Sequence, residues 1–211
     1  MARLFSIKPS ITLKGRKFQG LRGWAGKPLH PPMTDLPIAG YLFAAAFDLV
    51  SFFGDRMDNA SLAREAFVAA TFVIVAGALA STLAIITGVW DWVRGLDREK
   101  TGPLGRAKHT QVWRTANWHA ILMVTTTVVV IVDIVCRMKD YGSPSTSLAV
   151  LVLSCLAAVL VSFGSFYGGS LVFDYQFNVE SLKGSTAYDE TEVDQLPGQK
   201  SQPATPPVPP T

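Results

Sequence analysis

Charge is scarce in this sequence. Only 17% of its 211 residues are charged, and nearly all of them lie outside four long apolar runs, whereas a soluble domain carries about 25%. The runs are Leu36–Gly54, Phe67–Trp90, Trp118–Cys136 and Leu148–Phe173. Each can cross a hydrocarbon core of about 30 Å, which needs roughly 20 helical residues. The chain is therefore predicted to be an integral membrane protein.

Alternation of apolar and polar residues is also absent from these runs, which excludes a transmembrane β-barrel. Inside a bilayer the backbone polar groups must be satisfied within each segment, so every run should be α-helical. The prediction is an all-α, four-helix membrane bundle occupying residues 30–180. Its spans are expected at about 36–54, 67–90, 118–136 and 148–173.

Cysteine and histidine are rare. Cys136 and Cys155 have no metal-type spacing and are expected to differ in depth by about 10 Å, beyond the reach of a disulfide, so both are interpreted as packing residues. The three histidines, His30, His109 and His119, all belong to one side of the predicted bundle. A membrane-crossing cytochrome b with two haems needs histidines at both depths, so this class of protein is disfavoured.

Lysine and arginine are distributed very unevenly, which sets the orientation. Fifteen lie before the first run, between the second and third runs, or in the tail, and four lie on the other side: Arg56, Arg64, Arg137 and Lys139. Positive residues concentrate on the cytoplasmic face. Both termini are therefore predicted to be cytoplasmic, in a bacterial inner membrane.

The two ends of the chain differ in composition. Residues 1–29 are basic and are predicted to lie on anionic lipid, where a well-placed Lys or Arg contributes about 1 kcal/mol. Residues 181–211 are acidic and then Pro-rich, and such a composition favours disorder.

Two carboxylates interrupt the apolar runs, Asp48 in the first and Asp133 in the third. Ionisable groups inside a span cost about 2.5–3.5 kcal/mol each and usually face the bundle. Both are expected in the outer part of the bilayer, with Arg137 four residues after Asp133 on the same helical face. One interpretation is a carboxylate pair that takes up protons or cations. The other is a structural Asp133–Arg137 pair, with Asp48 bonded to a neighbouring hydroxyl.

A second polar cluster is predicted at the cytoplasmic end. His30 and His119 are the two histidines that could share one metal ion or haem, because His109 should lie about 15 Å from His119 along the third helix. Asp35, expected to cap the first helix, and Asp91, at the end of the second span, are candidate oxygen ligands or partners of those ligands. Asp174 closes the fourth span. The alternative interpretation is that the histidines are hydrogen-bonded structural residues.

Small residues recur at helical spacing. Gly164 and Gly168 form such a pair in the fourth run, and Gly77 with Ser81 another in the second. These faces permit close helix approach. They predict either packing within the bundle or, through Gly164 and Gly168, a homodimer.

Several stretches together resemble a known family. They are Gly26-Lys-Pro-Leu-His-Pro-Pro-Met-Thr-Asp-Leu-Pro-Ile-Ala39 with Asp48, Gly88-Val-Trp-Asp-Trp92, His119, and Gly168-Gly-Ser-Leu-Val-Phe173. Over about Gly26 to Glu180 the chain resembles the bacterial membrane family called domain of unknown function 2231. The resemblance implies four helices and, because some relatives are fused to a Rieske iron–sulfur domain, a link to redox membranes. This chain lacks the Rieske ligands, and it has Lys27 and Ser170 where relatives carry histidine.

The functional hypothesis is a non-enzymatic, accessory or redox-associated membrane component, with a haem or metal ion as the cofactor to test at His30, Asp35, Asp91 and His119. The expected partners are the lipid bilayer and a respiratory or other redox membrane complex, with no nucleic acid. The alternative is a small transporter or proton/cation pathway that uses Asp48 and Asp133.

Overall fold

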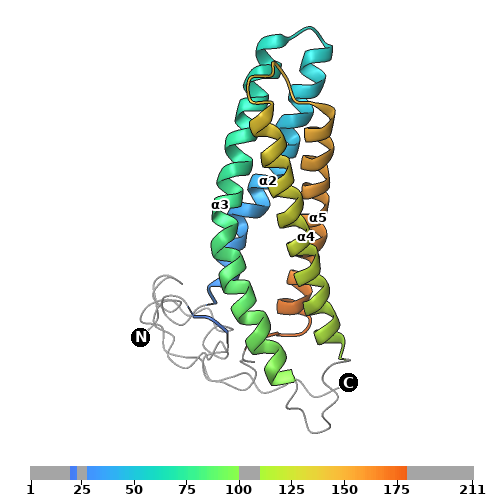
Figure 1. Cartoon of the computed structure of the whole chain (residues 1–211). Helices are drawn as coiled ribbons and strands as arrows, with labels where there is room; N and C mark the ends of the chain where they lie inside the picture. The colour runs from blue at the N-terminus through green and yellow to red at the C-terminus, as the bar shows by residue number, and fades with distance from the viewer. Residues whose placement is uncertain (1–19, 23–27, 100–109, 180–211) are drawn as a thin grey trace, which may run out of the picture.

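The computed structural model describes residues 20–22, 28–99 and 110–179. Within these ranges the chain forms four helices and no strand. The helices are α2 (His30–Arg56), α3 (Ala60–Glu99), α4 (Gln111–Lys139) and α5 (Leu148–Phe173). They run alternately up and down in one elongated bundle (Figure 1). The prediction of an all-α, four-helix architecture is confirmed.

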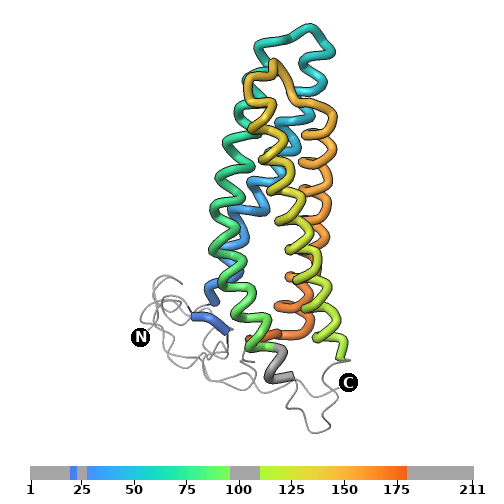
Figure 2. The backbone as a smooth tube through the Cα atoms, viewed as in Figure 1, coloured from blue at the N-terminus to red at the C-terminus, as the bar shows by residue number. Residues whose placement is uncertain are grey.

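Neighbouring helices are antiparallel, and the order around the bundle is α3, α2, α5, α4. α2 packs most closely on α3 and α4 on α5, so the bundle consists of two hairpins (Figure 2). The backbones of α2 and α4 make no contact, since these two helices lie across a diagonal. We call the end with the connections at residues 57–59 and 140–147 the distal end. The proximal end is the one where α2 and α4 begin and α3 and α5 end.

The start of α2 differs from the prediction. The helix begins at His30, with prolines in its first turn and Leu29 at the N-cap position. Proline is suited to a helix start because its fixed φ matches the helix and its missing N–H has no helical partner there. Asp35 therefore lies inside α2, and the prediction that it caps the first helix is wrong.

Two other helix starts use side-chain caps. Thr110 accepts a hydrogen bond from the Trp113 amide, at 3.1 Å, as the N-cap of α4. Ser147 accepts from the Val150 amide at 3.4 Å at the start of α5. Such hydroxyls satisfy amides that lack helical partners. Asp174 follows the last residue of α5, as expected.

The core contains small side chains where helices approach. A Cβ atom on Gly40 of α2 would lie 3.0 Å from the Gly77 Cα of α3, so these backbones touch. The central cluster consists of Tyr41, Ala44, Ile74, Val130, Ala157 and Val161. Both cysteines are free thiols, half-buried on α4 and α5.

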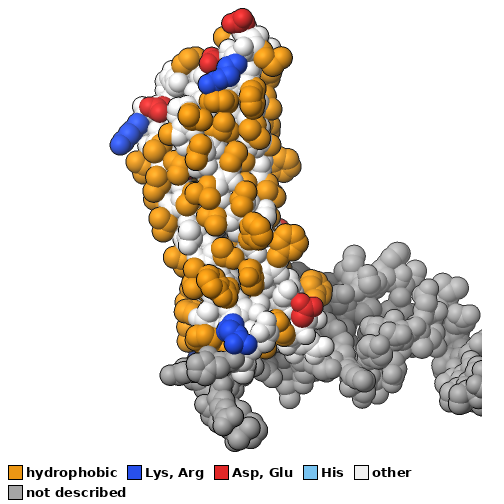
Figure 3. Space-filling view, turned by 90° about the vertical axis from the view of Figure 1, so that its right-hand side faces the viewer, with side chains coloured by type: hydrophobic (Ala, Val, Ile, Leu, Met, Phe, Trp, Pro, Cys, Tyr) orange, Lys and Arg blue, Asp and Glu red, His pale blue; other side chains and the backbone are white. Residues whose placement is uncertain are grey.

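The outer surface is apolar. Only 17–39% of the most apolar window of each helix is buried within the chain. Large side chains such as Phe72 and Phe166 are 66% and 75% exposed. In Figure 3 hydrophobic side chains cover most of one face, and charged side chains lie near its two ends. All four helices are long and apolar enough to span a membrane, and lipid is the environment in which such a surface is stable.

The predicted lipid-bound segment, residues 1–29, lies mostly outside the described residues, and the predicted disordered tail, residues 181–211, lies wholly outside them. His109 lies outside them as well.

Candidate functional site

The distal half of the bundle contains a fully buried charged network. Asp48 of α2 and Asp133 and Arg137 of α4 are each 0% exposed. Arg137 Nε donates to Asp133 Oδ1 at 2.9 Å and Arg137 NH1 donates to Asp48 Oδ1 at 3.0 Å. Arg137 NH2 donates to the remaining oxygen of both carboxylates, 3.2 Å away for Asp133. One guanidinium thus satisfies four carboxylate oxygens and joins the diagonal pair α2 and α4.

Hydroxyl groups extend this network to the other helices. Thr146, in the connection between α4 and α5, donates to Asp48 Oδ1 at 2.9 Å. The Thr146 amide donates to Ser51 Oγ at 2.9 Å, and Ser51 donates to the Ala63 carbonyl of α3 at 2.7 Å. The distal network therefore connects α2, α3, α4 and the loop that leads into α5.

The distal network contains both contacts of the structural interpretation given above. Asp133 pairs with Arg137, and the Thr146 hydroxyl is bonded to Asp48. It adds the Asp48–Arg137 ion pair, which local sequence spacing did not indicate. Every oxygen of the two carboxylates already accepts a hydrogen bond from Arg137. A buried charge is tolerated when it is paired in this way. The network accordingly has the character of an internal cross-link between helices.

The proximal half brings His30 and His119 together. Their ring centroids are 6.3 Å apart and the ring planes are inclined by 78°. His30 Nδ1 lies 3.0 Å from the Ala84 carbonyl oxygen of α3 and 3.2 Å from Thr87 Oγ1. His119 Nδ1 lies 2.8 Å from the Gly164 carbonyl oxygen of α5. A carbonyl can only accept, so Nδ1 carries the proton in both rings and Nε2 keeps its lone pair.

The two hairpins hold their histidines in the same way. Gly88 follows Ala84 by one helical turn, and Gly168 follows Gly164 by one turn. A Cβ atom on Gly88 would lie 2.7 Å from His30 Cε1, and one on Gly168 would lie 3.1 Å from His119 Cε1. The Cε1 edge of each imidazole therefore lies close to a glycine of the neighbouring helix, where a larger residue would leave little room.

The correspondence extends along α2 and α4. Asp48 follows His30 by the same number of residues as Arg137 follows His119. The paired side chains of the distal network are thus at equivalent positions in the two hairpins, as are the paired imidazoles of the proximal end. The two halves are related by an approximate two-fold arrangement about the bundle axis.

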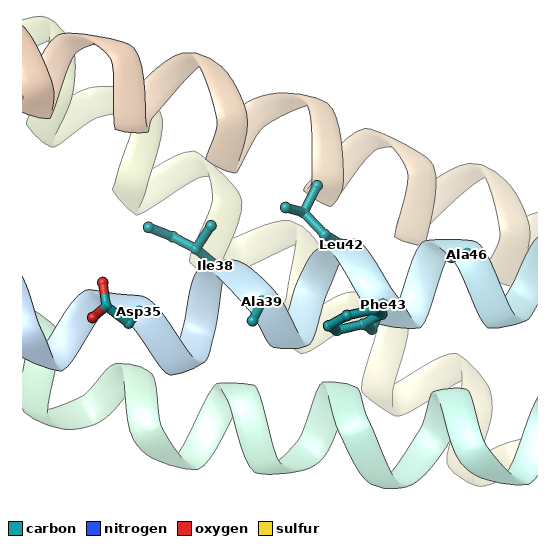
Figure 4. A pocket seen from close by; sticks show the side chains of 6 residues that line it. All are labelled: Asp35, Ile38, Ala39, Leu42, Phe43 and Ala46. Carbon is teal, nitrogen blue, oxygen red and sulfur yellow. The ribbon is translucent and has the colours of Figure 1, made fainter.

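The three aspartates predicted at the histidine end of the bundle differ in their surroundings. Asp35 is exposed and lines a groove of ≈ 510 Å³ along α2 (Figure 4). Asp91 is buried, but its Oδ1 accepts from the Leu21 amide at 2.6 Å. Asp174 lines a separate groove of ≈ 570 Å³ with residues of α2 and α5. In the part of the chain that the structure describes, no three His, Cys, Asp or Glu side chains form a group that could hold a metal ion.

The comparison with known proteins gives one result. The model of the family described as "Predicted membrane protein (DUF2231)" matches residues 26–181. The chain belongs to this family. Neither a curated protein nor a solved structure matches it.

The match covers all four helices of this DUF2231 protein, including both polar clusters. The Gly-Lys-Pro-Leu-His stretch at residues 26–30 places its histidine at the first residue of α2. The family assignment therefore agrees with the resemblance carried by that stretch.

The glycine pair of α5 in the DUF2231 protein faces α4 of the same chain. A Cβ atom on Gly164 would lie 1.8 Å from Met123 Cε, and Gly168 faces His119. A homodimer formed through this face would have to displace α4. In this structure the two glycines allow α5 to pack closely against α4 within the bundle.

Three partners of the polar residues in the DUF2231 protein could not be predicted from side-chain type or spacing. The backbone carbonyls of Ala84 and Gly164 accept hydrogen bonds from the histidines. Any residue type can make such a bond, so the side chains do not indicate it. Thr146 reaches Asp48 from a loop. The equal His30–Asp48 and His119–Arg137 spacing was the available signal for the Asp48–Arg137 pair.

Proposed function

We propose that this DUF2231 membrane protein is a non-enzymatic, redox-associated component of a bacterial inner membrane, with one cofactor site formed by His30 and His119. The observation that carries the proposal is the pairing of two imidazoles whose Nδ1 atoms are both bound to backbone carbonyls. Histidines that bind metals are usually held in this way, because the Nδ1 bond fixes the tautomer and aims Nε2.

The surroundings support a site for a cofactor over a purely structural contact. Both imidazoles are half-buried and not fully buried, so an Nε2 atom without a protein partner is open to a bound group. Among the described residues, the hydrogen bonds of both histidines involve Nδ1 alone. Two Nε2 lone pairs at one level of the bundle are suited to a shared metal centre.

The proposed placement in the membrane follows from charge. Fifteen of the nineteen Lys and Arg residues belong to the termini, to the proximal ends of α3 and α4, or to the connection between these two helices, which supports a cytoplasmic proximal end. The histidine site would then lie near the cytoplasmic face, where a respiratory or other redox membrane complex is the proposed partner. Labelling of cysteines introduced at residues 94–108 tests this orientation, and their reaction with an impermeant reagent from the periplasm would overturn it.

The cofactor site is tested on protein purified from its native membrane in mild detergent. We expect a stoichiometric metal or metal-containing group that is lost when either His30 or His119 is changed to alanine. Its absence, together with an absorption spectrum without visible bands, would refute the proposed site.

A transporter or proton/cation pathway through Asp48 and Asp133 is the second candidate. It is favoured by one observation, that two buried carboxylates face a single guanidinium, so a proton or cation would balance the remaining negative charge. Cation and proton flux into proteoliposomes tests this candidate. Unchanged flux in Asp48→Asn would exclude it.

A further inference from the structure

We infer that the group bound between His30 and His119 is an iron tetrapyrrole, with the two imidazoles as axial ligands on opposite sides of the iron. This inference rests on the proposed function and identifies its ligand. It depends on three features of the proximal end: the separation of the rings, the supply of other ligands, and the space around the imidazoles.

The separation of the rings matches trans coordination. A bond from a histidine nitrogen to a first-row metal is about 2.0 Å long, and the ring centroid lies about 1.2 Å behind the nitrogen for ring bonds of about 1.33 Å. Two imidazoles on opposite sides of one metal would therefore have centroids about 6.4 Å apart. At a tetrahedral angle the same bonds give about 5.2 Å. The observed 6.3 Å agrees with the trans geometry.

The remaining ligands must come from the bound group. Trans coordination leaves the equatorial positions of an iron unfilled, and the described residues offer no third His, Cys, Asp or Glu side chain at this site. A tetrapyrrole brings four equatorial nitrogens of its own and requires only two axial ligands from protein. Zinc sites, by contrast, use three or four protein ligands.

Small residues line the faces that the imidazoles touch. Gly88 and Gly168 contact the rings directly, and Ala84, Thr87 and Ala116 are buried at the same end of the bundle. The largest side chain among these five residues is that of Thr87. Such a lining is suited to a flat macrocycle held edge-on between helices.

An unpaired donor lies close to this level. Trp92 follows Gly88 by one helical turn toward the proximal end. Its Nε1 is buried and has no hydrogen-bond partner among the residues that the structure describes. An orphan donor of this kind is uncommon in folded proteins and suggests an acceptor supplied by a ligand. The carboxylate substituents of a haem, directed toward the proximal end, would provide one.

The test is a titration of the detergent-purified full chain with hemin, followed by absorption and electron paramagnetic resonance spectra. We expect one hemin per chain and a six-coordinate, low-spin signal. His119→Met should keep a low-spin haem at a higher reduction potential, because methionine ligation raises it. His30→Ala should lose the low-spin signal. His109→Ala is the matched control and should behave as the unchanged chain.

The outcomes separate the two proposals. Low-spin hemin that is unaffected by His30→Ala and His119→Met would overturn the inference, as would the absence of hemin binding. If hemin does not bind but another metal is present stoichiometrically and is lost with either histidine, only the tetrapyrrole is excluded and the cofactor site stands. If neither is found, both proposals fail. Helical content measured by circular dichroism distinguishes a lost ligand from a lost fold.

Discussion

Removal of the Arg137 guanidinium is the most direct test of the distal network. Arg137→Met keeps an unbranched side chain of similar length but leaves the carboxylates of Asp48 and Asp133 buried without their cation. Arg137 makes four hydrogen bonds to these groups. Hydrogen bonds to charged groups contribute about 1.5–3 kcal/mol each, which sets a gross loss of about 6–12 kcal/mol.

The net loss is expected to be smaller. The freed carboxylates can take up protons, and interactions within a membrane are also partly replaced in the unfolded state. Removing one partner of a buried ion pair costs about 3–5 kcal/mol, and this is the predicted decrease in the free energy of unfolding. It would be measured by titrating detergent-solubilised protein with sodium dodecyl sulfate and following circular dichroism.

Arg56→Met is the matched control. Arg56 lies at the same end of the bundle, is exposed, and donates to the Phe52 carbonyl of its own helix. Its replacement should change the unfolding free energy by less than about 0.5 kcal/mol. A triple variant in which Asp48 and Asp133 are also changed to Asn should recover part of the loss, because no charge remains buried. If Arg137→Met and Arg56→Met were equally stable, the network would not be a cross-link.

Three smaller changes follow from the packing. Gly40→Ala should destabilise by about 1–3 kcal/mol in the same assay, because its Cβ would meet the backbone of Gly77 at 3.0 Å. Gly169→Ala is its control and should be neutral or stabilising, since the new Cβ would have no described atom within 4 Å. A loss equal to that of Gly40→Ala would contradict the packing argument. Thr146→Val should cost about 1 kcal/mol, and a much larger loss would mean that the hydroxyl does more than bind Asp48. Gly168→Ala should lower hemin occupancy by pushing His119 aside, and unchanged occupancy would show that the ring position is not set by this glycine.

The helices could be predicted well from the sequence, and their ends less well. Continuous apolar runs identify membrane helices because lipid permits few other structures. The start of α2 was placed too late because Asp35 was interpreted as its cap, although Pro31 and Pro32 are compatible with a first turn. Apolar length also underestimated α3, which continues to Glu99 beyond its apolar run.

The polar residues could be predicted to different extents. The Asp133–Arg137 pair follows from spacing on one helix, whereas the Asp48–Arg137 pair depends on which helices face each other across the bundle. His30 and His119 were expected at one level, and the structure places them there. Asp35 was assigned to the same group from its level alone, which does not determine the direction in which a side chain points around a helix.

Both polar clusters cross the same diagonal of the bundle, from α2 to α4, and they do so at opposite ends of helices whose backbones never touch. Neither hairpin can slide along the other or rotate about its own axis without breaking the Arg137 ion pairs and separating the imidazoles. A ligand that draws His30 and His119 together would consequently change the position of one hairpin relative to the other. The Arg137 ion pairs at the distal end would stay in place during that movement.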